Sequence, residues 1–229
     1  MGPAGRPGPG ASQEFGPNRV QQSLLDIDDL GGPFGEVDND SNDSGVDSSD
    51  PTLGCANSLD LLDNKANDSA DASRSFSVGD DSAAQVSTVV ISYQSPELAD
   101  KAMDDLARGL ERCETVDVDE DGTGHFDLEP STDEDSWADG DRQINIRLTG
   151  TLTNANTRTP VGLDASAVRV AQNVVYVVMM DAAHDFGDHQ RDLTDAAVAR
   201  LRAVAADEDP PEPTPLLEDY QPGKIGTTA

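Results

Sequence analysis

The stretch from Gln85 to Cys113 limits the possible folds more than any other part of this sequence. Its beginning, Gln85 to Ile91, is rich in β-branched apolar residues, which is typical of a buried strand. Ser95 then offers an N-cap, and Pro96 suits the first helical position. Apolar side chains recur every four residues from Leu98 to Leu110, which predicts an amphipathic helix. The stretch therefore predicts a strand–helix unit of a fold and contains no catalytic chemistry.

Other apolar patterns predict further strands. Alternation of apolar and polar residues indicates strands at 72–78, 116–118, 125–128 and 143–152, and residues 166–180 suggest two strands that are broken near 171–173. The strands at 116–118 and 125–128 flank an acidic turn, so we expect a hairpin with one solvated face. Residues 31–54 and 132–141 are expected to be loops, and the second of these holds the only tryptophan, Trp137.

Helices are expected at three more places. Residues 23–30 and 56–65 each suit a short helix, and Thr194 can cap a last helix with Ala197, Val198, Leu201 and Val204 on its inward face. Because helices do not alternate regularly with strands, the sequence predicts an α+β fold. We expect an antiparallel sheet with the long helix, the C-terminal helix and the short N-terminal helices packed on one of its faces.

Both ends of the chain differ in composition from the middle. Residues 1–21 are rich in Gly and Pro, and residues 207–229 are acidic and interrupted by Pro. Such segments contain too few apolar residues to offset the entropy of ordering them, so they predict a disordered linker or cloning scar and a disordered tail. Residues 22–206 then suit one domain of ordinary size.

Charge excludes two classes of partner. The formal net charge is -30, from 45 acidic and 15 basic residues, so the chain should repel nucleic acids and anionic membrane surfaces. No stretch reaches the roughly 20 apolar residues of a membrane span, and no export signal is visible at the start. A membrane tether, where one exists, is expected outside this sequence.

Two groups of acidic and histidine residues are candidate metal ligands. Asp117, Asp119 and Asp121 begin like a calcium loop, but its twelfth position holds Leu128 instead of the required glutamate. A solvated hairpin turn explains these residues better, with weak calcium binding as the alternative.

The second group lies before the last predicted helix. His184, Asp185, Asp188 and His189 stand close together, and such side chains can bind a metal. Loops of a very acidic protein also collect these residues by composition alone. We therefore predict no metal site and no cofactor, with both groups kept as weak candidates.

Catalytic motifs are missing from the sequence. Asp185-Phe186-Gly187 matches the magnesium-binding tripeptide of protein kinases, but the glycine-rich loop, the strand lysine and the catalytic loop of a kinase are absent. No serine or cysteine is paired with an evident histidine, so we predict no catalytic residues and no enzyme.

The chain has two cysteines, Cys55 and Cys113. Either they form a disulfide or they are two buried free thiols. A bridge would close a loop of about 57 residues and contribute roughly 4 kcal/mol on the chain-entropy model. The position of Cys113 on an apolar stripe favours packing or bridging over a reactive thiol.

Several short sequence motifs occur in a characteristic order along residues 22–206. The first three are Leu24 to Leu30, then Cys55, then the set Tyr93, Ser95, Pro96, Ala99, Ala102 and Cys113. Gly140-Asp141 and the run Arg147-Leu148-Thr149-Gly150 follow. The last two are the set Val168, Arg169, Val170, Asn173, Val174, Val175 and Val177, and the set Ala197, Arg200, Leu201, Arg202 and Ala203. In this order they resemble the extracellular sensor domains of mycobacterial PknH-type serine/threonine kinases and the related actinobacterial sensor-domain lipoproteins.

This resemblance implies an exported α+β domain, at the cell envelope, that binds an unidentified small molecule or cell-wall component in a cleft. This sequence differs from the kinase sensor domains because it has two cysteines where they have four, and because it shows no lipobox and no membrane span. We expect a monomeric, non-catalytic sensor domain. The alternatives are a secreted hydrolase that uses carboxylates of the acidic hairpin and the Trp137 loop, and an envelope assembly or interaction protein.

Overall fold

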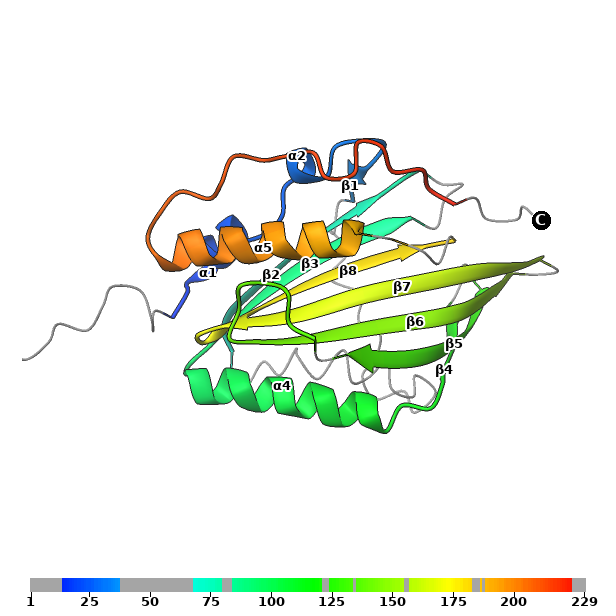
Figure 1. Cartoon of the computed structure of the whole chain (residues 1–229), viewed down its shortest axis with the longest axis horizontal. Coiled ribbons are helices and arrows are strands. Elements are labelled where there is room, and N and C mark those ends of the chain that lie inside the picture. The colour runs from blue at the N-terminus through cyan, green and yellow to red at the C-terminus, as the bar shows by residue number, and fades with distance from the viewer. Residues whose placement is uncertain are drawn as a thin grey trace, which may run out of the picture.

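The structure is a computed structural model that describes residues 14–37, 68–79, 84–120, 124–133, 135–154, 157–182, 186 and 188–223. Within these residues one antiparallel sheet has eight strands in the order β1-β2-β3-β8-β7-β6-β5-β4 (Figure 1). The strands are β1 (Gly35–Glu36), β2 (Asp68–Ser77), β3 (Gln85–Tyr93), β4 (Val116–Glu120), β5 (Gly124–Asp133), β6 (Arg142–Asn154), β7 (Thr157–Val170) and β8 (Asn173–Asp181).

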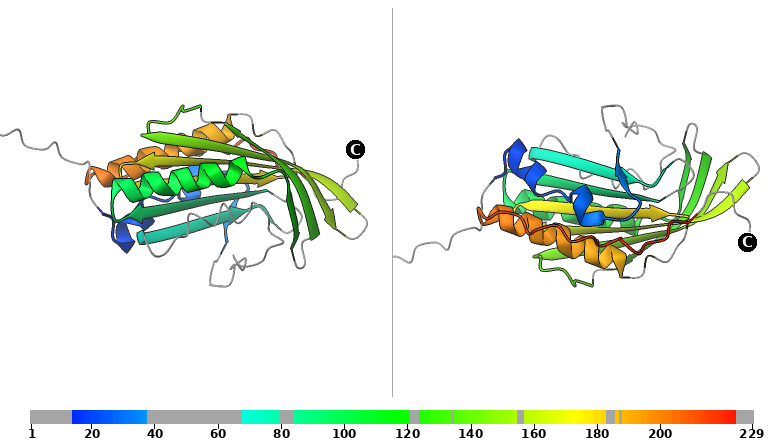
Figure 2. Two further views of the ribbon diagram at one scale, coloured as in Figure 1. Left: turned by 90° about the horizontal axis from the view of Figure 1, so that it is seen from below. Right: turned by 90° about the horizontal axis from the view of Figure 1, so that it is seen from above.

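Helices cover both faces of this sheet. α4 (Pro96–Glu111) lies on one face, and α5 (His189–Ala205) lies on the other together with α1 (Pro17–Gln22) and α2 (Ile27–Leu30), as the two views of Figure 2 show. The α+β prediction and the antiparallel sheet are confirmed, but the prediction that the helices share one face is wrong. The reason is that the central strands are apolar on both sides: in β3, Val86 and Val90 belong to the α5-side core while Ile91 and Tyr93 belong to the α4-side core.

The strand–helix unit at 85–113 forms as predicted. The Ser95 hydroxyl accepts a hydrogen bond from the backbone N–H of Leu98 at 3.3 Å, Pro96 is the first helical residue, and Arg112 ends the helix. The inward face of α4 buries Ala99, Ala102, Met103, Leu106 and Leu110. This face packs over β3, β8 and β7.

Two strand pairs predicted from the sequence are present. β4 and β5 pair as an antiparallel hairpin in which Val116 lies opposite Leu128. β7 and β8 are separated by a tight turn at Ala171 and Gln172, and Ala171 has a positive φ of 54°. Strand β7 begins at Thr157, well before the predicted residue 166, because its first half pairs with the long strand β6.

The N-terminal helical region starts earlier than predicted. Phe15 and Val20 are buried in the α5-side core, and α1 lies within the segment that the composition predicts to be a disordered linker. Of the helix expected at 23–30, only α2 is helical, and Asp26 is its N-cap. Two contacts hold this segment in addition to burial: the Phe15 N–H donates to the Ser92 hydroxyl at 2.9 Å, and the Arg19 guanidinium carbon lies 4.5 Å from the centre of the Phe15 ring.

Helix α5 also starts earlier than predicted. It begins at His189, so Thr194 lies inside the helix and donates its hydroxyl hydrogen bond to the Gln190 carbonyl at 2.7 Å instead of capping. Ala197, Val198, Leu201 and Val204 do face the core.

The C-terminal segment returns over the α5 side of the molecule instead of leaving it (Figure 1, orange to red). The N–H groups of Leu216 and Leu217 donate to the carbonyls of Asp29 and Leu30 at 2.9 and 2.7 Å. Leu217 and Tyr220 are buried in the core on this side. The prediction of a disordered tail from residue 207 therefore fails for residues up to 223, because two apolar anchors and backbone pairing hold them.

Candidate functional site

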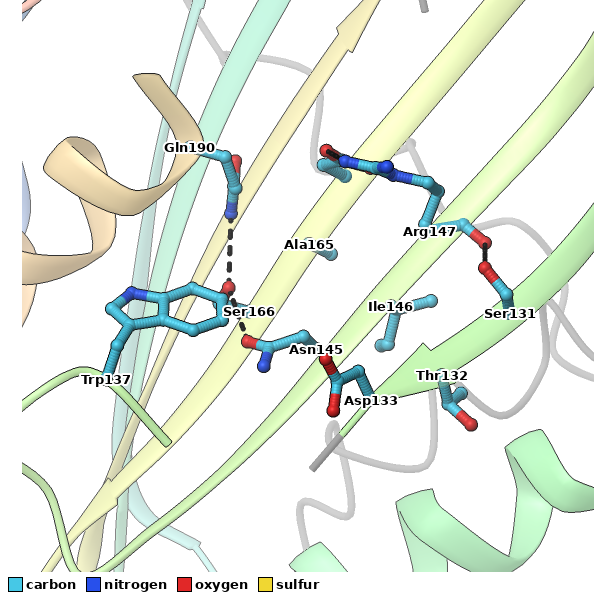
Figure 3. A pocket seen from close by; sticks show the side chains of 11 residues that line it. Ser131, Thr132, Asp133, Trp137, Asn145, Ile146, Arg147, Ala165, Ser166 and Gln190 are labelled. Carbon is cyan, nitrogen blue, oxygen red and sulfur yellow. Dashed lines mark hydrogen bonds and ion pairs between the residues drawn. The ribbon is translucent and has the colours of Figure 1, made fainter. Parts of the chain in front are cut away.

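A pocket of about 260 Å³ opens on the α5 side of the sheet, beside the first turn of α5 and the loop that carries Trp137 (Figure 3). We call it the Trp137 pocket. Its lining comes from β5, β6, β7, the Trp137 loop and α5, with Ser131, Thr132, Asp133, Trp137, Asn145, Ile146, Arg147, Asp164, Ala165, Ser166 and Gln190.

Strand alternation explains why polar side chains gather here. Along β6, Ile144, Ile146 and Leu148 belong to the core under α4, so the side chains between them face the other way. Antiparallel register then places Asn145 opposite Ser166 and Arg147 opposite Asp164. The floor of the pocket is therefore a set of cross-strand polar pairs.

Arg147 and Asp164 form a bidentate ion pair across β6 and β7. The Arg147 Nε and Nη2 atoms donate to the two Asp164 carboxylate oxygens at 2.8 and 2.7 Å. Asp164 is buried while the Arg147 side chain is about half exposed. Bidentate geometry is the strongest form of such a pair, and it leaves neither carboxylate oxygen free of a charged donor.

A buried glutamine ties the Trp137 loop to the sheet. The Gln143 Oε1 atom accepts from the backbone N–H groups of Trp137 and Ala138, both at 3.1 Å. Its Nε2 atom donates to the Asn145 Oδ1 atom at 2.7 Å. The same Asn145 Oδ1 atom also accepts from the Ser166 hydroxyl at 3.0 Å. This network positions Trp137 at the wall of the pocket before any ligand binds.

Gln190 closes the pocket from α5. Its side chain is held by donation from Nε2 to the Val177 carbonyl at 2.9 Å, and only 6% of the residue is exposed. The Gln190 Oε1 atom and the Trp137 Nε1 atom are buried and have no hydrogen-bond partner in the described part of the chain. Both atoms are shielded by the protein, and the amide nitrogen of Gln190, not its oxygen, is directed at Ser166 (Figure 3).

Trp137 itself is held from the side of α5. The Arg191 guanidinium carbon lies 5.8 Å from the centre of the indole ring, within cation–π range. Figure 3 shows the indole lying alongside Ser166 and Gln190. The ring is thus fixed both by its backbone and by a neighbouring cation.

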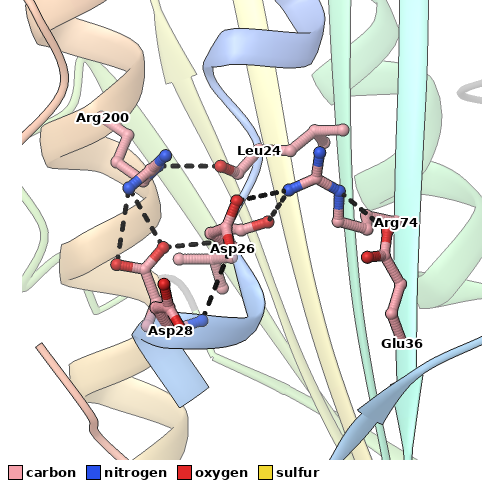
Figure 4. A network of polar contacts seen from close by, with 8 residues as sticks. Leu24, Asp26, Asp28, Glu36, Arg74 and Arg200 are labelled. Carbon is pink, nitrogen blue, oxygen red and sulfur yellow. Dashed lines mark hydrogen bonds and ion pairs between the residues drawn. The ribbon is translucent and has the colours of Figure 1, made fainter. Parts of the chain in front are cut away.

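A second cavity, of about 330 Å³, lies between α1, β2 and α5 and is lined by Asn18, Gln21, Gln22, Asp26, Arg74 and Arg200. Its two guanidinium groups already have partners (Figure 4). Arg74 contacts Asp26 at 3.0 Å and Glu36 at 3.2 Å, and Arg200 contacts the Leu24 carbonyl at 2.8 Å and Asp29 at 3.1 Å. This arrangement joins the N-terminal segment to the sheet and to α5, which is a structural role.

Asp29 is the most buried acid of that network. Burial raises its pKa above the usual range, against the opposing effects of the Asp26 backbone N–H and the Arg200 guanidinium. Its Oδ2 atom accepts from the Asp26 N–H at 2.7 Å and completes a reciprocal cap of α2.

The first group of metal candidates does not form a site in the described residues. Asp117 lies on β4 and its Oδ1 atom is 3.6 Å from the His125 Nε2 atom. Asp119 lies on β4, and Asp121 lies outside the described residues. No group of three or more His, Cys, Asp or Glu side chains that could hold a metal occurs among the residues that the structure describes.

The second group is divided. His184 and Asp185 lie outside the described residues, while Asp188 precedes α5 and His189 begins it. The His189 ring packs edge-on against Tyr220 with centroids 5.3 Å apart. In the tripeptide that resembles a kinase motif, Phe186 is a buried core residue.

Cys113 follows α4 and is partly buried against the core on that side. No free cysteine occurs among the described residues. Cys55 lies outside them, so its pairing with Cys113 stays a prediction.

The sequence patterns predict the Trp137 loop and the alternation of strand 143–152, but they do not single out Asn145, Ser166 or Gln190 as parts of a pocket. Ser166 stands between two alanines and Gln190 between His189 and Arg191, and nothing in the sequence places either near Asn145.

Comparisons with known proteins support the fold. No family model and no curated protein sequence matches this chain. Among solved structures, the extracellular domain of PknH from Mycobacterium tuberculosis matches with a TM-score of 0.54 and 14% identity over 86% of this chain and 99% of that domain. This chain therefore has the fold of the PknH extracellular domain. No helix in the described part of the chain combines the length and the apolar character needed to cross a membrane.

Proposed function

We propose that this chain is a non-catalytic sensor domain that binds a small ligand in the Trp137 pocket, outside the cell at the envelope. The observation that carries this proposal is the lining of the pocket, which places the indole of Trp137 beside the polar side chains of Asn145 and Ser166. An aromatic wall beside a few fixed polar groups is the usual lining of a small-molecule site.

The chemistry of the pocket favours binding over catalysis. A general acid or nucleophilic carboxylate must be able to exchange a proton or attack. Asp164 instead accepts two hydrogen bonds from one guanidinium, and the Asp133 Oδ1 atom accepts from the Asp135 N–H at 2.8 Å. The hydrolase alternative therefore has less support.

The assembly alternative has less support as well. β4 is one of the two edge strands of the sheet, and its sequence Val116-Asp117-Val118-Asp119-Glu120 contains three acidic residues. Like charges on an exposed edge oppose pairing with a second strand. The similarity of the fold to a kinase extracellular domain, together with the order of the short motifs in the sequence, supports the proposal of an extracellular sensor of the actinobacterial type.

The test uses Trp137, which is the only tryptophan and so reports on the pocket alone. The full chain is screened by thermal shift against sugars, peptidoglycan fragments, lipids, amino acids and divalent ions, and each hit is titrated while Trp137 fluorescence is recorded. We expect a saturable change in fluorescence for at least one compound that also raises Tm. Hits that raise Tm without changing the fluorescence, or no hits at all, would contradict the proposal.

A further inference from the structure

The buried carboxylate of the Trp137 pocket, Asp164, is neutralised by Arg147. Arg147 is paired with Asp164 in two hydrogen bonds, and Arg191 already lies over the Trp137 ring. A ligand cation at the indole would meet the like charge of Arg191, and a ligand anion would meet Asp133 and a protein of net charge -30. The pocket therefore favours an uncharged ligand.

The polar groups of the lining match a ligand that both donates and accepts. They include the hydroxyls of Ser131 and Thr132 and the amide of Asn145. A hydroxyl group can donate and accept at the same time, so several hydroxyls on one small molecule match this lining better than a carboxylate or an amine does.

The size and shape of the Trp137 pocket limit the classes of ligand that fit it. A volume of about 260 Å³ lies just below the roughly 300–1,000 Å³ of pockets for drug-sized ligands. The indole of Trp137 adds a rigid apolar wall, against which the C–H face of a saturated ring can pack. A ring with polar edges and apolar faces fits both features.

We infer that the Trp137 pocket binds a neutral sugar, as a single ring or the end unit of a longer saccharide. This inference rests on the proposed function and adds the chemical class of the ligand. Trp137 packs against the ring, and the Ser131 hydroxyl and the Asn145 amide hydrogen-bond to its hydroxyls.

The test compares sugars that differ only in charge. Glucose, galactose and mannose, with their uronic acids and amino sugars, are titrated into the full chain by calorimetry and by Trp137 fluorescence. We expect at least one neutral sugar to bind with a Kd tenfold or more below that of its charged counterparts. Saturable binding of charged compounds or of another ligand class at Trp137, without binding of neutral sugars, would overturn this inference and leave the proposed function standing. The absence of any ligand at Trp137 overturns both.

Two variants and a control locate the binding. Trp137→Ala should weaken the sugar tenfold or more, and Trp137→Phe, which keeps an aromatic wall, should recover part of that loss. Asn18→Ala, in the second cavity, should leave the Kd unchanged. Calorimetry is used because the Trp137 variants lack the fluorophore, and circular dichroism checks that each variant is folded. An unchanged Kd in folded Trp137→Ala would place the sugar elsewhere and overturn the inference.

Discussion

Tyr220 donates a hydrogen bond from its hydroxyl to the Oδ2 atom of Asp181, 39 residues earlier in the chain. Asp181 is fully buried at the end of β8, and the Gly223 N–H donates to its two carboxylate oxygens at 3.1 and 2.9 Å. A buried carboxylate is stable only when donors surround it. The Ala182 N–H also donates to Asp181, and the C-terminal segment supplies the remaining donors, so it is part of the folded domain.

Removing the Tyr220 hydroxyl should destabilise the domain. Tyr220→Phe leaves Asp181 with one donor fewer, and the expected loss is about 1–3 kcal/mol of unfolding free energy, measured by urea denaturation. Tyr176→Phe is the matched control, because the Tyr176 hydroxyl is buried without a partner in the described residues. The control should leave stability unchanged or raise it. Equal losses in both variants would contradict this reading of the two hydroxyls.

Alkaline pH should unfold the domain partly through the same tyrosines. Burial, followed by the hydrogen bond and the charge of Asp181, raises the pKa of Tyr220 well above 10, and burial raises that of Tyr176. Above pH 10 the unfolded chain therefore loses these protons while the folded chain keeps them, so stability falls as pH rises. Unfolding free energies measured between pH 8 and pH 11 should fall less steeply in Tyr220→Phe than in the parent. An identical slope in both proteins would show that Tyr220 is not responsible.

Arg200 should matter more to stability than Arg74. The Arg200 and Asp29 side chains are 12% and 6% exposed, whereas Arg74 is 28% exposed and its partners are more exposed still. Arg200→Met leaves the buried Asp29 without its cation, and breaking a buried pair in this way costs roughly 3–5 kcal/mol. Arg74→Met should cost about 1 kcal/mol or less, since its partners remain solvated. Thermal denaturation of the two variants measures which one loses more stability, and a larger loss of stability for Arg74→Met would contradict the prediction.

A disulfide between Cys55 and Cys113 should be present in protein exported by its own host. Mass spectrometry after alkylation without reduction should then detect no modified cysteine. The single variants Cys55→Ser and Cys113→Ser should each lose roughly 4 kcal/mol, because both open the same loop. A loss confined to Cys113→Ser would instead assign that residue a packing role beside α4.

The strand and helix patterns along the chain predicted most elements of the fold, because the local signals at Ser95, at the 116–128 hairpin and around Ala171 are strong. The layering is not evident from the sequence, because β3 and β8 carry apolar side chains on both faces and a continuous apolar run does not reveal that helices lie on both sides. The ends were missed because composition averages over a segment, whereas Phe15, Leu217 and Tyr220 act as single anchors.

The sequence by itself determined the α+β class, the helix that follows Ser95 and the alternation that turns Asn145 and Arg147 away from the α4-side core. Those properties depend on residues close together in the chain. Only the tertiary structure decided that Ser166 lies opposite Asn145 and that Gln190 of α5 meets Trp137 across the pocket. Strand register and helix packing bring together residues that lie up to 53 positions apart, as Trp137 and Gln190 do, and no local pattern encodes that meeting.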